Sequence, residues 1–193
     1  MKGILFTEIL FRATIFGLKK ETRRVIKGIS NDWVLKDSTW NPDIGSFQFE
    51  SPSGEKKNIK PRYKPGDIVY LKEPFFYDNG IVRYKFGTPH AAMKFKNKLF
   101  MPAKAARYFI RIEEVYPHLV REIPFKSAVD EWCIDIYPCS HLNTWDRYKH
   151  SFLKVWDNVN EEEYQSKFNP WCFAYKYKLL SENSFDKVEY VYL

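Results

Sequence analysis

Eight residues near the amino terminus combine groups that can bind or transform a charged ligand. The segment Gly17-Leu18-Lys19-Lys20-Glu21-Thr22-Arg23-Arg24 holds a hydroxyl, a carboxylate and four cations. A Thr hydroxyl becomes a nucleophile when a neighbouring base removes its proton. Lys19 can be that base only in its neutral form, which burial and the nearby charge of Arg23 and Arg24 favour. The same cations can instead bind phosphate groups.

The spacing of this segment sets a condition on the chemistry. Lys19 and Thr22 are three residues apart, so a regular strand would point their side chains to opposite faces. The alternation after the glycine predicts a strand in which Thr22 and Arg24 share one face and Arg23 points to the other. Lys19 and Thr22 can therefore act together only if Lys19 belongs to the turn before the strand. Gly17, which tolerates a positive φ, predicts such a turn at the end of a short helix.

A glutamate much later in the chain is the candidate partner of these groups. Pro124 suits the first turn of a helix. The apolar stripe of that helix comprises Phe125, Ala128, Val129 and Trp132. At about 100° per residue, Glu131 falls on the flank of the stripe, where a carboxylate can border a cleft. Glu131 can then activate water, orient an amine, or pair with one of the cations near residue 20.

The remaining patterns predict strands with a few helices. Thr7 is the expected cap of a helix whose apolar face includes Ile9, Ala13 and Phe16, and a second long helix is expected at 145–159. Strands are expected at 4–6, 68–72, 81–86, 108–113, 171–179 and 188–193. Residues 28–62 read as a long loop with one hairpin that begins near Ser46. The predicted fold class is α+β, with a mostly antiparallel, barrel-like sheet and a few flanking helices.

Composition limits the class of protein. The chain has 193 residues, of which 45% are hydrophobic and 18% aromatic, values that fit one globular domain. Three cysteines do not make a disulfide framework and favour a reducing compartment. We find no apolar run of membrane-spanning length and no signal-peptide pattern. A cytoplasmic protein without a membrane partner is expected.

Positive charge is concentrated in the first part of the chain. Residues 1–112 contain 22 Lys and Arg against 10 Asp and Glu, whereas residues 113–193 contain 9 against 14. This asymmetry favours a basic face that binds a polyanion, although a solvated basic surface would give the same count. Aromatic side chains favour strands, and some can also stack on bases. The predicted nucleic-acid contacts are Lys20, Arg23, Arg24, Lys104 and Arg107.

The sequence predicts no metal and no cofactor. Cys133, Cys139 and His141 are the nearest approach to a metal-binding set, but their spacing matches no tight Cys-x-x-Cys hairpin. We find no glycine-rich phosphate loop and no metal-binding helix motif.

Several short motifs follow one another in a specific order. They are Ile4-Leu5-Phe6, Gly17-x-Lys19-x-x-Thr22-Arg23-Arg24, Pro65-Gly66-Asp67 with Glu73, Phe100-Met101-Pro102, Ala128-x-x-Glu131, Phe152-x-x-x-Trp156-Asp157 and Asn169-Pro170-Trp171. Their order and spacing resemble the ASCH domain of the PUA-like superfamily, in its phage- and prophage-associated branch. The resemblance spans 1–193 as a single domain, with insertions at 28–62 and 133–145.

The resemblance implies a small PUA-like β-barrel with a cleft for RNA or a modified nucleotide. One bacterial branch of the family hydrolyses the acetyl amide of acetylcytidine, and its proposed catalytic residues match Lys19, Thr22 and Glu131. The chain departs from the family pattern at Lys20 and Glu21, which add a charged pair beside the site. It is also longer than those hydrolases.

Three functions are therefore expected as alternatives. The first is an RNA- or nucleotide-binding module whose cleft is edged by Lys19, Thr22, Arg24 and Glu131. The second is an amidohydrolase for an acylated nucleoside, in which Lys19, Thr22 and Glu131 are catalytic. The third is a phage accessory protein that binds a protein partner, which an exposed aromatic patch around Trp33 and Trp40 would favour.

Overall fold

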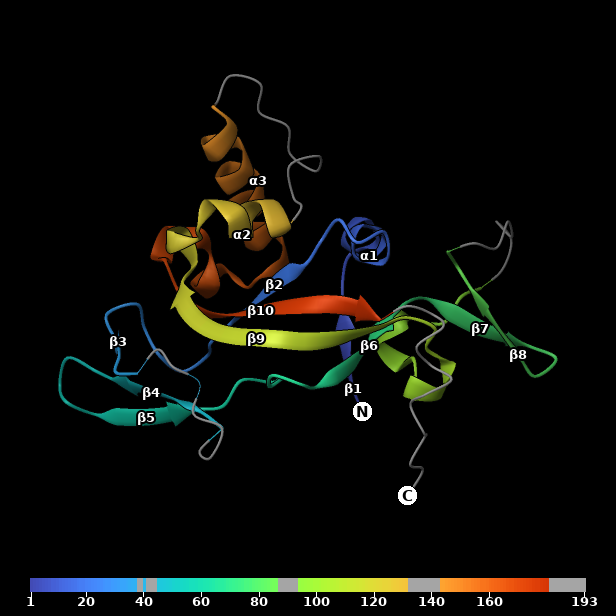
Figure 1. The fold of residues 1–193 in the computed structure, drawn as a ribbon, viewed down its shortest axis with the longest axis horizontal. Helices are drawn as coiled ribbons and strands as arrows, with labels where there is room; N and C mark the ends of the chain where they lie inside the picture. The colour runs from blue at the N-terminus through green and yellow to red at the C-terminus, as the bar shows by residue number, and fades with distance from the viewer. Residues whose placement is uncertain (38–39, 41–44, 87–93, 132–142, 181–193) are drawn as a thin grey trace.

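The computed structural model describes residues 1–37, 40, 45–86, 94–131 and 143–180. Within these residues the fold is α+β, with ten strands and three α-helices (Figure 1). The strand predicted at 188–193, most of the insertion at 133–145, and the candidate ligands Cys133, Cys139 and His141 lie outside the described residues.

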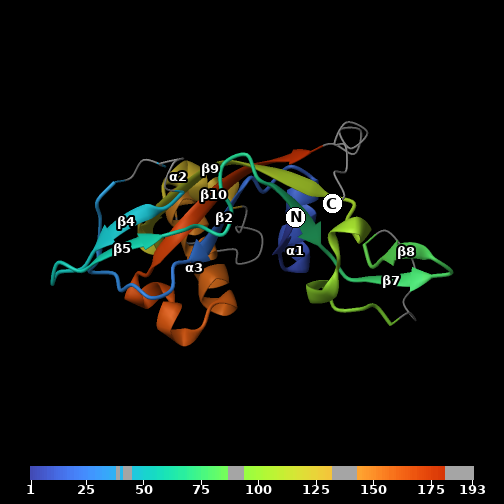
Figure 2. The same ribbon diagram turned by 90° about the horizontal axis from the view of Figure 1, so that it is seen from below.

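A five-stranded sheet forms the centre of the molecule. Across the sheet the strands are β1 (Lys2–Leu5), β6 (Ile68–Lys72), β9 (Phe109–Leu119), β10 (Trp171–Leu180) and β2 (Glu21–Val25). β1 pairs with β6 in parallel, and the other pairs are antiparallel. The long pair β9–β10 changes register between Lys176 and Tyr177. Such a bulge bends and twists a strand, and both strands curve along their length (Figure 2).

Strand β10 is buried on both faces over its first half. The alternation at 171–179 predicted a strand with one buried face, but Trp171 to Tyr175 are all buried. On one face Trp171 meets the ring of Phe49 at 5.1 Å between centroids. On the other face Cys172 lies beside His118. The strand is covered on both sides, as in the interior of a layered fold.

Helix α1 (Glu8–Ile15) begins and ends where the sequence predicted. The Thr7 side chain accepts a hydrogen bond from the helix backbone at 3.5 Å, and Gly17 has a φ of +72° just after the helix. The predicted apolar face was confirmed at Ala13, which is 1% exposed, but wrong at Ile9 and Phe16, which are 49% and 72% exposed. Phe11, which the prediction left out, is 1% exposed. Apolar residues occur on more than one side of this helix, so packing against the sheet selected the face.

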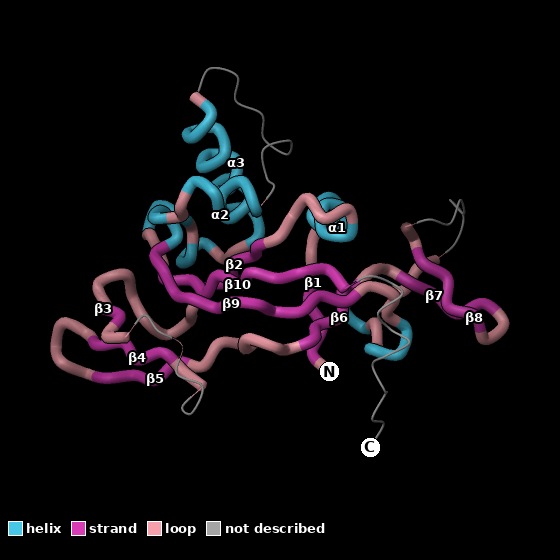
Figure 3. Tube along the Cα trace, in the orientation of Figure 1, coloured by secondary structure: helices cyan, strands magenta, loops and turns pink. Residues whose placement is uncertain are grey.

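Helices α2 (Phe125–Asp130) and α3 (Thr144–Val159) pack on each other at one end of the sheet. The rings of Phe125 and Trp145 meet edge to face at 5.5 Å between centroids. All three helices lie on one side of β9 and β10 in the view of Figure 3, opposite strands β3 to β5. The described chain also has short 3-10 turns at Lys98–Phe100, Ala103–Ala105, Val120–Glu122, Glu162–Tyr164 and Ser166–Phe168.

The described part of 28–62 contains regular strands where the sequence predicted mostly loop. They form a sheet of β3 (Val34–Leu35), β4 (Phe47–Glu50) and β5 (Lys56–Ile59), which includes the predicted hairpin. Trp33 is only 8% exposed, and its carbonyl accepts a hydrogen bond from Trp171 Nε1 at 3.0 Å. Trp40 packs on the Phe47 ring at 5.6 Å. Trp33 and Trp40 therefore do not form the exposed aromatic patch that would have favoured a protein-binding module, because both rings pack against the core.

A second hairpin comprises β7 (Phe75–Asp78) and β8 (Ile81–Tyr84), as the turn at residues 78–80 predicted. Arg107 binds Glu73 at its base through two hydrogen bonds of 2.8 and 2.9 Å. The Arg107 guanidinium carbon lies 4.3 Å from the centre of the Tyr84 ring and 4.9 Å from that of Tyr108. These contacts tie the hairpin to the central sheet.

The described strands do not close into the barrel that the sequence predicted. β1 and β2 are the two edges of the central sheet, and no backbone ladder joins them in the described part of the chain. A side chain spans the interval instead, since Arg24 of β2 donates to the carbonyl of Leu5 in β1 at 2.9 Å. The sheet thus curls until its edges face each other across an opening. No helix among the described residues is long and apolar enough to span a membrane.

We predict that the sheet formed by β3, β4 and β5 contributes to the hydrophobic core and to the stability of the whole protein. Phe49 is fully buried against Trp171, so Phe49→Ala should lower the free energy of unfolding by about 3–5 kcal/mol. Urea denaturation followed by tryptophan fluorescence measures this change. Gln48→Ala, on the other face of the same strand, is the control and should change it by less than about 0.5 kcal/mol. Equal small effects of both substitutions would contradict the prediction.

Candidate functional site

A cavity of about 770 Å³ occupies the opening between the edges of the sheet. Residues of β1, β2, α3 and the segment 59–63 line it. Its volume lies within the range of about 300–1,000 Å³ that is common for small-molecule sites. The cavity therefore lies where no backbone ladder joins the two edges of the central sheet among the described residues.

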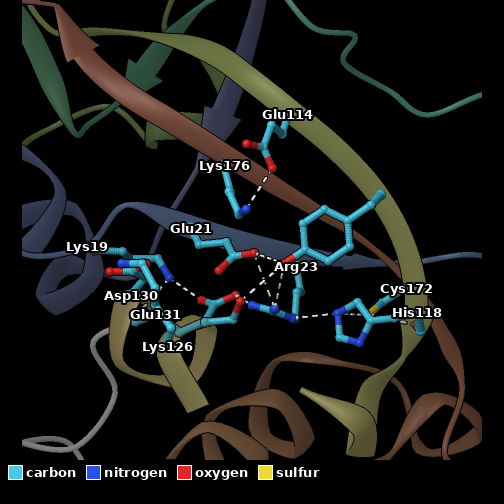
Figure 4. Close-up of polar contacts among 12 residues, drawn as sticks. Lys19, Glu21, Arg23, Glu114, His118, Lys126, Asp130, Glu131, Cys172 and Lys176 are labelled. Atoms are coloured by element: carbon cyan, nitrogen blue, oxygen red, sulfur yellow. Dashed lines mark hydrogen bonds and ion pairs between the residues drawn. The ribbon is translucent and has the colours of Figure 1, made fainter. Parts of the chain in front are cut away.

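Lys19 and Glu131 form a buried ion pair (Figure 4). Glu131 is also one of the residues that line the cavity. The Lys19 ammonium donates to the Glu131 carboxylate and also to its backbone carbonyl at 3.0 Å. Arg23 Nη1 donates to the other carboxylate oxygen of Glu131 at 3.0 Å. Lys19, Arg23 and Glu131 are each at most 4% exposed. The partnership predicted from the sequence across 112 residues is present.

Local backbone geometry brings the pair together. Lys19 lies in the turn after α1, with its amide bonded to the Ala13 carbonyl at 3.1 Å. The amide of Lys20 donates to the carbonyl of Asp130 at 2.9 Å, which joins this turn to the end of α2. Glu131 follows directly as the last residue of that helix end. The predicted turn position of Lys19 is confirmed.

Thr22 reaches the cavity from the other face of β2. Its hydroxyl accepts a hydrogen bond from Arg24 Nη1 at 3.1 Å. Thr22 and Arg24 therefore share a face, as the alternation predicted, while Arg23 points toward Glu131. Thr22 and Glu131 both line the cavity. Of the three residues predicted as catalytic, Thr22 and Glu131 thus line the cavity, whereas Lys19 does not line it and contacts Glu131 instead.

A second carboxylate, Glu21, completes the buried charge cluster. It is fully buried, and one of its oxygens accepts from the Tyr116 hydroxyl and from Arg23 Nη2 at 3.4 Å. Tyr116 also lies 3.2 Å from the Ser127 hydroxyl. Burial and the adjacent Glu21 raise the pKa of Tyr116, so this phenol keeps its proton. With Lys19 the cluster holds two cations and two carboxylates, which limits the cost of burying them.

A neutral histidine, His118, also binds the guanidinium of Arg23. His118 Nε2 accepts from Arg23 Nε at 2.8 Å, so the ring proton is on Nδ1, which lies 2.8 Å from the Leu119 carbonyl. Burial and the charge of Arg23 lower the pKa of His118 to about 3. Burial raises the pKa of the neighbouring Cys172 to about 12, so it remains a thiol. Neither His118 nor Cys172 lies in a sequence motif. The one sequence signal that could have identified them is their place on the same face of adjacent strands as Tyr116.

The cavity lining is strongly basic and aromatic. Of the described residues that line it, six are basic and one is acidic, namely Arg23, Arg24, Lys27, Lys60, Arg62 and Lys98 against Glu131. Six aromatic residues line it as well: Phe6, Tyr63, Phe152, Trp156, Phe173 and Tyr175. The guanidinium carbon of Arg24 lies 5.5 Å from the centre of the Phe6 ring. Sequence patterns did not mark Lys60 or Arg62, which come from a segment between two strands.

The residues predicted to contact nucleic acid fall into separate groups. Arg23 and Arg24 line the cavity, and Lys20 is exposed beside the turn. Lys104 and Arg107 do not line this cavity. Lys104 lies in the 3-10 turn Ala103–Ala105, and Arg107 pairs with Glu73. Their role in binding stays a prediction. Among the described residues, no group of three His, Cys, Asp or Glu side chains is placed to hold a metal ion.

Comparison with known proteins adds no relative. No protein-family model, curated protein or solved structure matches this chain. The function is therefore inferred from the side chains of the cavity and from the motifs in the sequence.

We predict that His118 makes stability depend on pH. Its pKa of about 3 in the folded protein is below the ordinary value of 6.5. As pH falls from about 7 to 5, protons bind the unfolded chain first, and this residue should remove about 2 kcal/mol from the free energy of unfolding. Urea denaturation at both pH values measures the loss. His118→Gln keeps an acceptor for Arg23 but cannot titrate, so an equal loss in that variant would contradict the prediction.

Proposed function

We propose that this chain is an RNA- or nucleotide-binding module of the PUA-like, ASCH kind, and that the cavity between β1 and β2 holds a nucleotide. The observation that carries the proposal is the lining, in which basic residues outnumber acidic ones by six to one and aromatic rings form much of the wall. Phosphate needs cations, and a base needs flat apolar faces. Both occur here in one site.

The edges of the sheet supply further recognition groups. An edge strand carries backbone N–H and C=O groups that no neighbouring strand uses. Arg24 already bonds two carbonyls in this opening, those of Arg23 at 2.9 Å and Leu5 at 2.9 Å. A base in the cavity can use the same kind of group for its polar edge. The curled sheet with facing edges supports a PUA-like fold whose cleft takes the place of the last ladder.

The contacts inside the site favour binding over catalysis. Lys19 and Glu131 hold each other, and Arg23 occupies the second carboxylate oxygen. The Thr22 hydroxyl accepts a hydrogen bond from Arg24, and both residues lie on the face of β2 opposite to Arg23. A binding site needs charges held in fixed positions, as they are here. A hydrolase needs a free base next to its nucleophile.

We expect salt-sensitive binding of RNA through Arg24. Arg24→Gln should weaken binding of a fluorescent single-stranded RNA about tenfold, and should reduce the slope of log K against log salt by about 0.7. Fluorescence anisotropy at salt concentrations from about 50 to 200 mM measures both values. Lys167→Ala, which removes an exposed cation paired with Glu162 outside the cavity, is the control. Binding that is absent at low salt, or equal in both variants, would contradict the proposal.

A second candidate is an amidohydrolase that acts on an acylated nucleoside such as acetylcytidine. The observation that favours it is the buried Lys19–Glu131 pair beside a cavity that Thr22 also lines. In that reaction water adds across the amide, and the products are acetate and the free amine of the base. A bound substrate would have to draw Thr22 away from Arg24 and release Glu131 from one of its two cations.

Thr22→Val gives the sharpest test of this second candidate. The substitution removes the hydroxyl and keeps the side-chain shape, and it leaves the Lys19–Glu131 pair unchanged. A hydrolase should lose acetate release from acetylcytidine by about a hundredfold or more in this variant, while its thermal unfolding stays close to wild type. Lys19→Met and Glu131→Gln should also lose it. The absence of turnover by the wild-type protein across a panel of acylated nucleosides would exclude this candidate.

A further inference from the structure

A second cavity adjoins the first. Its volume is about 510 Å³, and it shares two lining residues, Phe6 and Lys98, with the cavity between β1 and β2. It lies between the start of α1 and the base of the β7–β8 hairpin, while the first cavity extends to α3. In Figure 2 α1 lies between α3 and that hairpin.

The second cavity repeats the chemistry of the first. Four of its described lining residues are basic, namely Lys72, Lys85, Lys96 and Lys98. One is acidic, Glu8, and it already pairs with Arg12 at 3.0 Å and with Lys85 at 3.4 Å. Phe11, Phe86 and Phe95 supply rings. Across both cavities nine basic residues line the surface against two acidic ones.

The boundary between the cavities is well fixed. The Lys98 ammonium donates to the carbonyl of Phe6. Lys98 begins a 3-10 turn that the Asn97 side chain caps, by accepting from the amide of Leu99 at 2.9 Å. On the side of the first cavity, the guanidinium of Arg24 lies over the Phe6 ring. A cation is therefore present at the crossing point, with further cations on both sides of it.

We propose that the ligand is a single-stranded oligonucleotide that fills both cavities, with one nucleotide between β1 and β2 and its neighbours extending past Phe6 and Lys98 into the second. This proposal rests on the proposed function and narrows it, since a mononucleotide would need only the first cavity. A continuous basic surface interleaved with rings fits a chain that carries a phosphate and a base at every step. An acidic peptide would use the cations but has no base for each ring.

The experiment compares a short and a long probe. Binding of cytidine monophosphate and of a mixed-sequence single-stranded RNA of about twelve nucleotides is measured for the wild type, for Arg24→Gln, and for Lys85→Ala combined with Lys96→Ala. The double variant should weaken RNA binding about tenfold and reduce the salt slope by about 1.4, because two phosphate contacts are lost. Its affinity for cytidine monophosphate should stay unchanged. Arg24→Gln should weaken both probes.

Each outcome bears on one claim. If the double variant leaves RNA affinity and salt slope unchanged while Arg24→Gln weakens both probes, the ligand does not extend into the second cavity. That result would leave the proposed function intact. Failure of Arg24→Gln to affect either probe would overturn the proposed function itself. If the wild-type protein binds an oligoglutamate peptide of similar charge as tightly as the RNA, the proposal of an oligonucleotide ligand is wrong and an acidic protein segment is the better candidate. Lys36→Ala with Lys167→Ala removes two exposed paired cations outside both cavities, and any loss in this control is subtracted.

Discussion

The buried ion pair between Arg23 and Glu131 is the interaction on which the rest of the site depends. Both side chains are within the protein, and removal of either partner would leave a charge uncompensated, at a cost of about 3–5 kcal/mol. Arg23 lies on an edge strand, Glu131 ends a helix, and His118 on β9 holds the same guanidinium from behind. The pair thereby fixes β2 against α2 and keeps the position of the sheet edge constant.

The fixed edge explains why the site is an opening rather than a surface patch. The interior of a small closed barrel is largely filled by its own side chains. Here the edges β1 and β2 face each other, and the Arg24 side chain bridges them where a ladder would otherwise run. Rings from β10 and α3, such as Phe173 and Phe152, then form apolar walls. The cavity thus lies where a side chain, rather than a backbone ladder, joins the two edges of the sheet.

The uneven charge of the chain becomes a local property of this opening. The six basic residues that line the first cavity all come from residues 1–112, and its acidic lining residue, Glu131, comes from the second part. The second part also supplies α3, whose apolar side faces the cavity. Folding therefore brings the basic part of the chain and the apolar side of α3 to one cavity, a combination suited to a ligand that is both charged and aromatic.

Local sequence determined the features that depend on a few neighbouring residues. The Thr7 cap, the turn at Gly17, the alternation of Thr22 and Arg24 and the hairpin at residues 78–80 were all predictable, because steric limits and backbone hydrogen bonds act over such short distances. The coarse α+β class followed from the same patterns. The partnership of Lys19 with Glu131 was expected from the family resemblance, and the structure confirmed the contact but not the role.

Tertiary structure alone decided the rest. The buried face of α1, the neutral His118 behind Arg23, the cations of the segment 59–63 and the open edge between β1 and β2 depend on contacts between residues far apart in the chain. Such contacts form only where whole elements pack, and apolar residues on several sides of a helix leave that packing undetermined by local pattern. The sequence by itself identified Lys19, Thr22 and Glu131 as candidate partners, and the packing of the sheet edges determined the shape and charge of the cavity.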